Sequence, residues 1–203
     1  MKITNLISHT RKAAMIATIT GVTAAGALGA ASTVLPTQSV QAASNSSASE
    51  ASYQRNLAIK NLNSFYKPAL KGQFPGNVQE FAIGKTKRAD VMKRFSSADV
   101  PRTSATGFDA YTATMGSPGY SFRYTNDVLS EIRYFGTNVE RQTNIGGITM
   151  QLLRQQWYAP SSTSTITTGK QKQTKVTYNR GDYKLEFIFN TGTDLDHINL
   201  VKK

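Results

Sequence analysis

Residues 81–95 read FAIGKTKRADVMKRF, and a related stretch, TNIGGITMQLLRQQW, follows at residues 143–157. Each stretch contains an Ile-Gly pair, followed by an aliphatic and then an aromatic residue, and the offset between the copies is 62 residues. The matched pairs are Ile83 and Ile145, Val91 and Leu153, and Phe95 and Trp157. Repetition at a fixed offset indicates one structural unit that occurs twice in the chain.

An alternating aromatic stretch follows each copy. Residues 120–124 read YSFRY in the first copy, and residues 183–187 read YKLEF in the second. The copies also end alike, with LSEIRY at 129–134 and LDHINL at 195–200. Alternation of large apolar and polar residues predicts β-strands with one buried face. The aromatic side chains are therefore expected to pack on the repeat helices.

These patterns predict an α+β fold in which two tandem units, each a helix plus an antiparallel sheet, follow an N-terminal helix. The N-terminal helix is expected over residues 52–70, the first repeat over 81–135 and the second over 144–203. Thr86 and Thr149 are expected to cap the repeat helices. Strands are expected at residues 108–115, 118–125, 128–135, 173–179, 182–190 and 195–201, and a loop or ragged edge at 161–169.

Residues 1–42 have the features of an export signal. Basic residues lie near the N-terminus, an uncharged stretch spans residues 13–35, and Val40-Gln41-Ala42 supplies the small residues of a signal-peptidase site. Residues 43–51 are poor in apolar side chains, so they are expected to form a flexible leader after cleavage. A retained membrane anchor is the alternative that the uncharged stretch leaves open.

The composition excludes several classes of chemistry. The chain contains no cysteine, so it has no disulfide, thiolate metal site or cysteine nucleophile. It contains 24 Lys and Arg against 12 Asp and Glu, and cleavage after Ala42 would leave 21 against 12. A long Ala-rich signal and the lack of cysteine fit a Gram-positive bacterium, where the abundant polyanions outside the cell are wall polymers and anionic lipid headgroups. We therefore expect a secreted or cell-wall-associated protein without a nucleic-acid partner or stable membrane insertion.

No constellation of catalytic residues stands out in the sequence. His197 is the histidine that remains after residues 1–42 are removed, and strand alternation predicts a solvent-facing side chain on the polar face. Its neighbours Asp194 and Asp196 offer metal ligands, but a charged β-turn is favoured over a metal site. No cofactor, metal or catalytic residue is expected. A catalytic Asp/Glu pair stays open as an alternative, because the separation of such a pair is spatial and not sequential.

Two groups of charged residues are candidate binding sites. Lys85, Lys87 and Arg88 form a basic cluster at the start of the first repeat helix, where free backbone N–H groups favour anions. Strand alternation places the second group on the polar face of the sheet. This second group consists of Arg123, Arg133, Lys184, Glu186 and His197. The alternative for both groups is a solvated surface without a ligand.

A family resemblance accompanies these patterns. Phe81-Ala82-Ile83-Gly84-Lys85-Thr86, followed by Asp90-Val91-Met92-Lys93-Arg94-Phe95 and the ending Leu195-Asp196-His197-Ile198, resembles the YjgB family of uncharacterised exported Gram-positive proteins. The repeat starts are also similar to the tandem domains of β-lactamase inhibitor proteins and to outer-membrane-assembly lipoproteins of the SmpA/OmlA type. These resemblances imply helices on one side of a small antiparallel sheet, with a concave binding face in the inhibitor, and they imply no catalytic residues.

The sequence thus predicts an exported, non-enzymatic binding protein of the cell surface that engages an anionic cell-wall polymer or an exported protein partner. A small cell-wall hydrolase with an Asp/Glu pair is one alternative, and an inhibitor or chaperone of another exported enzyme is a second. One structural question separates the two candidate sites. If the N-terminal helix covers the polar sheet face, attention moves to the basic helix start; if that face is open, it is the better candidate.

Overall fold

The computed structural model describes residues 38–203. The predicted signal at residues 1–42, and the alternative of a membrane anchor there, therefore lie outside the described residues except for 38–42. Within residues 38–203 no helix combines the length and the apolar character that crossing a membrane requires.

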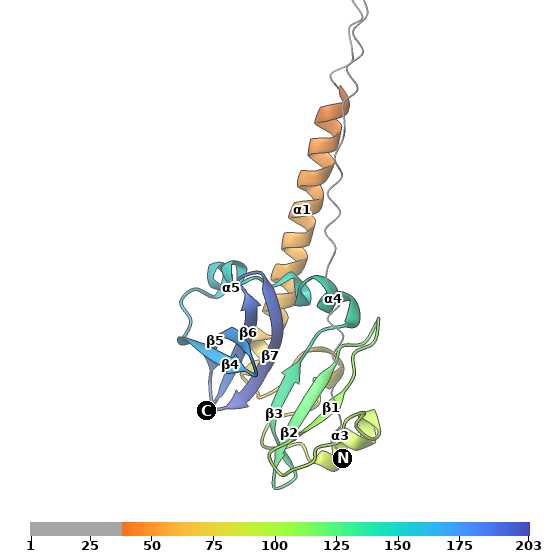
Figure 1. Cartoon of the computed structure of the whole chain (residues 1–203), viewed down its shortest axis with the longest axis vertical. Helices are drawn as coiled ribbons and strands as arrows, with labels where there is room; N and C mark the ends of the chain where they lie inside the picture. Colours follow the sequence, from red (N-terminus) through yellow and green to blue (C-terminus); the bar gives the residue numbers. More distant parts are fainter. Residues whose placement is uncertain (1–37) are drawn as a thin grey trace, which may run out of the picture. The chain divides into compact units, whose positions relative to one another are not determined.

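Seven antiparallel strands form one sheet in the order β1-β2-β3-β7-β6-β5-β4 (Figure 1). The strands are β1 (Phe108–Tyr111), β2 (Tyr120–Thr125), β3 (Val128–Tyr134), β4 (Ser162–Thr168), β5 (Gln171–Arg180), β6 (Tyr183–Thr191) and β7 (Asp194–Lys202). The three strands of the predicted first repeat form one part of the sheet and the four later strands form the other. With its helices, the sheet confirms the prediction of an α+β fold.

The two parts of the sheet meet where β3 pairs with β7. Arg133 lies opposite Asn199 in this pair, and both residues hold the fifth position of the similar endings LSEIRY and LDHINL. The neighbouring positions pair crosswise: Ile132, the fourth residue of the first ending, lies opposite Leu200, the sixth residue of the second. Two like units joined edge to edge would produce this register, although the duplication itself stays a prediction.

The pairing register also changes the predicted correspondence between the aromatic strands. Phe122 lies opposite Ile132 in the first part, and Phe187 lies opposite Ile198 in the second. Since Ile132 and Ile198 match in the two endings, Phe122 corresponds to Phe187, two residues further along β6 than the sequence comparison placed it. The alternation of apolar residues tolerates this shift because a slip of two residues keeps each side chain on the same face.

The longer helices pack on the apolar face of the sheet. The helices are α1 (Gln38–Ser64), α2 (Tyr66–Ala69), α3 (Arg88–Phe95), α4 (Asn138–Thr143) and α5 (Met150–Trp157), with 3-10 turns η1 (Gly76–Val78) and η2 (Ile145–Gly147). Ring centroids of Phe95 and Phe122 lie 6.2 Å apart, and those of Trp157 and Phe187 lie 5.5 Å apart. These contacts confirm that the aromatic strand residues bury against the repeat helices.

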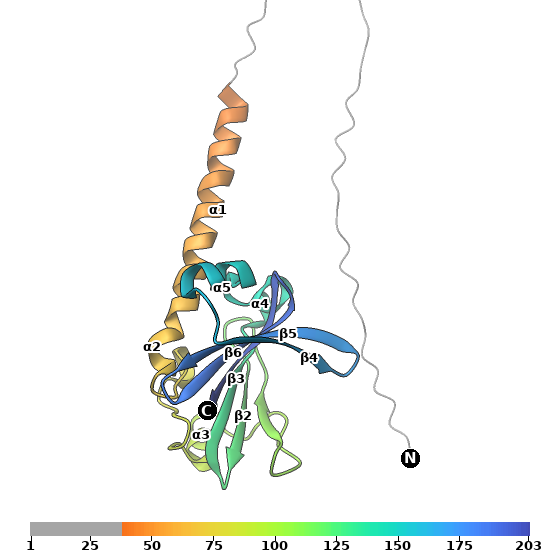
Figure 2. The same cartoon turned by 90° about the vertical axis from the view of Figure 1, so that its left-hand side faces the viewer.

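The N-terminal helix α1 packs on the same face, but it begins earlier than expected. Phe65, in the junction between α1 and α2, lies 5.4 Å from the ring of Tyr134. Residues 43–51, expected as a flexible leader, are helical in the structure. The Ala- and Ser-rich run lacks Gly and Pro, so nothing in it breaks a helix that tertiary contacts hold at the other end. Figure 2 shows this part of α1 extending away from the sheet.

Two local predictions about caps and edges have different outcomes. Thr149 caps α5, since its hydroxyl accepts a hydrogen bond from the Leu152 N–H at 3.1 Å. Thr86 does not cap α3, because its hydroxyl accepts from the Ala82 N–H and the helix begins at Arg88. The run at 161–169, expected as a loop or ragged edge, is largely the edge strand β4, whose alternating Thr residues suit a strand that pairs along β5.

Candidate functional site

The second face of the sheet carries polar side chains in two adjacent rows. We call this surface the open face, because α1, α3 and α5 contact the other side. One row across neighbouring strands is Phe108, Arg123, Glu131, Val201, Lys184 and Asn179. The next row is Ala110, Ser121, Arg133, Asn199, Glu186, Thr177 and Ser162. Arg123, Arg133, Lys184 and Glu186 therefore share a face, as predicted.

Ion pairs on the open face bury the acid and expose the base. Glu131 binds Arg123 at 2.9 Å and Arg133 at 2.7 Å; its side chain is 8% exposed, while those of the arginines are 36% and 29% exposed. Glu186 binds Lys175 at 3.2 Å, with exposures of 15% and 30%. In each of these pairs the cation is the outer partner, so the layer that meets solvent is predominantly basic.

Phe108 fixes both arginines in place. The guanidinium carbon of Arg123 lies 4.2 Å from the centre of the Phe108 ring, and that of Arg133 lies 4.1 Å from it. A guanidinium stacked on an aromatic ring and held by a carboxylate loses little further side-chain freedom when it binds a ligand. The cluster of Phe108, Glu131 and the two arginines is therefore preorganised.

Two polar atoms on the open face have no hydrogen-bond partner among the described residues. They are the Nε of Arg123 and the Oδ1 of Asn199, and both are buried. Asn199 lies between Arg133 and Glu186 in its row, at the junction of β3 and β7. A buried donor or acceptor without a partner costs free energy, which a bound ligand or water can recover.

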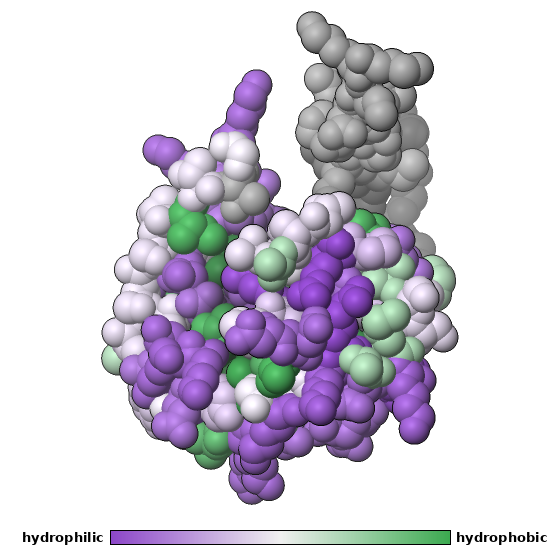
Figure 3. Space-filling model, turned by 90° about the horizontal axis from the view of Figure 1, so that it is seen from below, coloured by the Kyte–Doolittle hydropathy of each residue, from purple (hydrophilic) through white to green (hydrophobic). Residues whose placement is uncertain are grey.

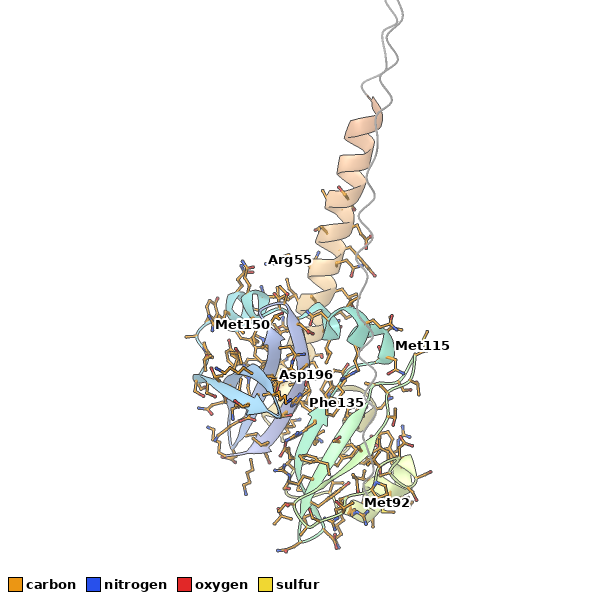
Figure 4. The ribbon with its side chains drawn as sticks, viewed as in Figure 1. Arg55, Met92, Met115, Phe135, Met150 and Asp196 are labelled. Atoms are coloured by element: carbon orange, nitrogen blue, oxygen red, sulfur yellow. The ribbon has the colours of Figure 1, made fainter. Side chains whose placement is uncertain are left out.

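His197 also lies on the open face, opposite Ile188, but the prediction that it faces solvent is wrong. It is 9% exposed, its ring centre lies 5.4 Å from that of Phe135, and its Nδ1 lies 2.6 Å from Asp196 Oδ2. The hydrogen bond with His197 lowers the pKa of Asp196. Asp196 and Phe135 are labelled in Figure 4 where β7 meets the end of β3. Packing against a neighbouring strand buries the ring, which alternation within one strand could not show.

The basic cluster at the start of α3 is not part of the open face. Arg88 turns to the buried carboxylate of Asp109, with Nε and Oδ2 2.7 Å apart. This contact stabilises the fold and removes Arg88 from the candidate ligand-binding residues. Lys85 and Lys87 are exposed, and Lys85 borders a shallow hollow together with the acids Glu80 and Asp90. The predicted basic cluster is thus divided between a structural ion pair and a mixed-charge surface.

The space above the open face is bordered at one end by α4. Arg141 of α4 lies over the ring of Phe135, and a hollow of about 290 Å³ lies between Arg141, Phe135 and Ser121. Figure 3 shows one end of the molecule, where hydrophilic side chains surround small hydrophobic spots.

The N-terminal helix packs on the opposite face of the sheet and does not cover the open face, which is therefore the better candidate. The floor of the open face is buried, since Ser121, Thr177 and Asn199 are each less than 9% exposed. Its accessible groups include Arg123, Arg133 and Lys175.

Sequence reasoning missed several residues of this site. Asn199 and Lys175 continue the same alternation as Arg133 and Glu186, so the pattern could have found them. Phe108 could not be found in this way, because only the pairing of β1 with β2 brings it opposite Arg123. The sequence of a single strand cannot indicate that an uncharged ring will pack between two arginines of other strands.

Comparison with known proteins identifies relatives of this chain. A family model described as a domain of unknown function, DUF4309, matches residues 62–201. The uncharacterized protein YjgB of Bacillus subtilis (strain 168) is 36% identical over 195 residues, which make up 96% of each chain. The crystal structure of a DUF4309 family protein, YjgB from Bacillus subtilis subsp. subtilis str. 168, superposes with a TM-score of 0.66 at 36% identity. The superposition covers 73% of this chain and 99% of that one.

A more distant likeness is to a cysteine-rich secretory protein from Staphylococcus aureus subsp. aureus Mu50. Its TM-score is 0.44 at 12% identity, over 65% of this chain and 48% of that one. The predicted resemblance to YjgB is confirmed by these comparisons. The resemblance to β-lactamase inhibitor proteins stays a prediction.

Proposed function

The chain belongs to the DUF4309 family, and on that premise we propose that it is an exported binding protein whose open face engages an anionic polymer of the cell wall. The observation that carries the proposal is the layering of charge on this face. Glu131 and Glu186 lie beneath Arg123, Arg133 and Lys175, which present their positive charge outward. Guanidinium groups bind phosphate and carboxylate oxygens in pairs of parallel hydrogen bonds.

The overall charge supports the same class of ligand. The chain carries 24 basic against 12 acidic side chains, which favours polyanions by long-range attraction. Arg123 and Arg133 are already fixed by Phe108 and Glu131, so binding costs them little conformational entropy. The polar rows cross the junction of β3 and β7, so the open face offers a polymer contacts from both parts of the sheet.

We propose binding without catalysis. Glu131 and Glu186 are engaged by cations, which is unfavourable for a general acid or base that must exchange protons with a substrate. The hydrolase alternative has Asp194 and Asp196, which share hydrogen bonds from the amide of Asn190. A peptidoglycan hydrolysis assay with Asp194→Asn and Asp196→Asn variants tests it. Hydrolysis that both variants lose would contradict the proposal.

Binding to purified walls tests the ligand class. The protein should bind walls that retain their anionic polymer and lose affinity as salt is raised from 0.05 to 0.5 M (about a threefold fall in the Debye length). Walls stripped of that polymer should bind little. Equal retention by stripped walls would point to a wall-bound protein as the partner and overturn the polymer proposal.

Two variants and a matched control locate the site. Arg123→Gln and Arg133→Gln should each weaken binding at least fivefold, because each removes a stacked guanidinium from the open face. Lys93→Gln removes the same charge from the exposed surface of α3 and should change affinity less than twofold. If all three variants lose affinity equally, net charge and not the open face is responsible.

Export itself stays a proposal and has its own measurement. N-terminal sequencing of the protein recovered from the wall fraction and the medium should find Ala43 as the first residue. A chain that keeps residues 1–42 and fractionates with membranes would support the anchor alternative instead.

A further inference from the structure

A cavity of about 380 Å³ lies on the helical side of the sheet, away from the open face. Its walls come from the end of α1, the loop around η1, the strands β2 and β3, and the segment from α4 to η2. Cavities of this volume hold small molecules, and in proteins they combine apolar walls with a few fixed polar groups. This one joins distant parts of the sequence, so it exists only in the folded chain.

Three aromatic side chains line the cavity, and the ring of Tyr134 contacts the other two. Phe65 and Tyr134 have ring centres 5.4 Å apart, and Tyr120 and Tyr134 have ring centres 5.7 Å apart. Tyr120 is only 2% exposed. Clusters of two or three aromatic rings around a small space are the usual binding site for quaternary ammonium groups, which the negative faces of the rings attract.

Glu140 supplies a negative charge at the same cavity. Its carboxylate is held by two backbone donors, the N–H of Thr137 at 2.7 Å and the N–H of Gly146 at 3.1 Å. Within residues 38–203 no Lys, Arg or His lies within ion-pair distance of Glu140, and none lines the cavity. This is unexpected in a chain with twice as many basic as acidic residues.

The tyrosine hydroxyls add polar groups without partners. Neither the Tyr120 nor the Tyr134 hydroxyl makes a hydrogen bond to the described part of the chain, and both residues line the cavity. Burial, and after it the nearby charge of Glu140, raises the pKa of both tyrosines. Glu140 and both tyrosines line the same cavity, so the carboxylate and the aromatic cluster belong to one site.

We propose that this cavity binds a small organic cation whose charge carries apolar substituents, such as a quaternary ammonium group. The rings of Phe65, Tyr120 and Tyr134 would contact the substituents, and the carboxylate of Glu140 would balance the charge. A hydroxyl on the ligand would bond to one of the tyrosine hydroxyls. This site is independent of the open face, and its ligand has the opposite charge.

Titration with choline and its neutral isostere 3,3-dimethylbutan-1-ol tests the proposal on the purified full chain. The two probes have the same shape, so they differ in charge alone. Choline should bind, by calorimetry and by shifts of Tyr120 and Tyr134 resonances, at least tenfold more tightly than the isostere. Equal affinities, or no binding of choline at 10 mM, would overturn the proposal. Ethanolamine should bind more weakly than choline, and the reverse order would overturn the quaternary class.

Variants assign the interaction to named groups. Glu140→Gln should lower choline affinity at least tenfold, whereas Glu80→Gln, which removes an exposed acid elsewhere, should leave it unchanged. Tyr134→Phe keeps the ring and should change affinity less than threefold, while Tyr134→Leu should lower it more than tenfold. The comparison of choline with its isostere needs no variant, so it decides the role of charge even if Glu140→Gln fails to fold. Unchanged affinity in Glu140→Gln would overturn the assignment.

Discussion

Asp109 is a fully buried carboxylate on the apolar face of the sheet, opposite Phe122. It accepts hydrogen bonds from Arg88 Nε at 2.7 Å, Arg88 Nη2 at 3.2 Å and the Arg102 N–H at 2.9 Å. Burial alone raises the pKa of Asp109, but these bonds outweigh it, and the pKa lies below its ordinary value. One residue therefore joins α3, the loop before β1 and the sheet.

Asp109→Asn should lower the free energy of unfolding by about 3 kcal/mol, because it leaves the Arg88 guanidinium and the Arg102 N–H poorly paired. Urea unfolding monitored by circular dichroism measures this change. Asp127→Asn is the matched control, since Asp127 pairs with Arg102 at 2.6 Å but is 71% exposed. It should cost less than about 1 kcal/mol. Equal losses would contradict the role given to burial.

Asp109 should also make the free energy of unfolding depend on pH. Because folding lowers the pKa of Asp109, its contribution is present above the unfolded value of about 3.9 and is lost as pH falls through the lower folded pKa. The unfolding free energy of the unchanged protein should therefore fall more steeply below pH 4 than that of Asp109→Asn. Parallel curves between pH 4 and pH 2 would show that Asp109 is not the group responsible.

A comparison of Gly72 with Gly84 can distinguish the cost of backbone strain from the cost of a steric clash. Both have positive φ, +70° at Gly72 and +79° at Gly84. A Cβ at Gly72 would lie 2.6 Å from the ring of Tyr183, whereas a Cβ at Gly84 would meet nothing within 4 Å. Gly84→Ala should cost about 1 kcal/mol from strain alone, and Gly72→Ala should cost about 1–3 kcal/mol more. Thermal unfolding of the two variants tests the difference.

At the scale of elements, α1 has two parts with different roles. Its described side chains are exposed up to Leu57, and from Ala58 onward one side of the helix is buried. Isolated helices gain little stability from their own hydrogen bonds, so the buried turns hold the exposed ones. The exposed part is therefore a projection from the domain and not part of its core.

Leu62→Ala should lower the free energy of unfolding by about 2–5 kcal/mol, because Leu62 is fully buried. Leu57→Ala makes the same change five residues earlier in the same helix, where the side chain is 39% exposed, and it should cost less than about 1 kcal/mol. Denaturant unfolding of both variants provides the measurement. The outer part of α1 contacts α5 through exposed polar groups, such as Arg55 and Gln155 with Nη2 and Oε1 3.1 Å apart, so a large loss at Leu57 would contradict the division of α1 into two parts.

At the scale of the whole molecule, one sheet joins both predicted repeats. Four residue pairs link β3 to β7, and Ile132, Leu200 and Ile198 near this junction are fully buried. Their side chains belong to one continuous core that also includes Trp157. The two predicted repeats should therefore unfold together and not as separate domains.

Ile132→Ala tests this cooperativity through a distant reporter. Trp157 is the single tryptophan, and it packs on Tyr178 and Phe187 in the second part of the sheet. Its fluorescence should report the same midpoint as circular dichroism, and Ile132→Ala should lower both by the same amount. Val139→Ala, at an exposed position, should lower neither. Two separate transitions would show that the repeats are independent domains.

Local patterns in the sequence were enough to predict the α+β class, most of the strands, the repeat helices α3 and α5, the buried part of α1 and the shared face of the charged strand residues, but not α4. It could do so because the periods of helix and strand are local properties of the backbone. Alternation placed Arg123, Arg133, Lys184 and Glu186 together, and the start of each repeat led to the correct family. The Ser/Thr-rich run at 161–169, for which a loop or a ragged edge was expected, forms the edge strand β4 because β5 offers it a partner.

Which charged side chains pair with one another depends on the tertiary structure. The alternation of β1 could not show that Phe108 lies opposite Arg123, and the helix pattern of α3 could not show that Arg88 turns to Asp109. The duplicated stretch also gives no indication of the cavity beside Glu140, because the walls of the cavity come from segments far apart in the chain. Side-chain partners depend on register and packing between distant elements, and a local pattern contains no information about either.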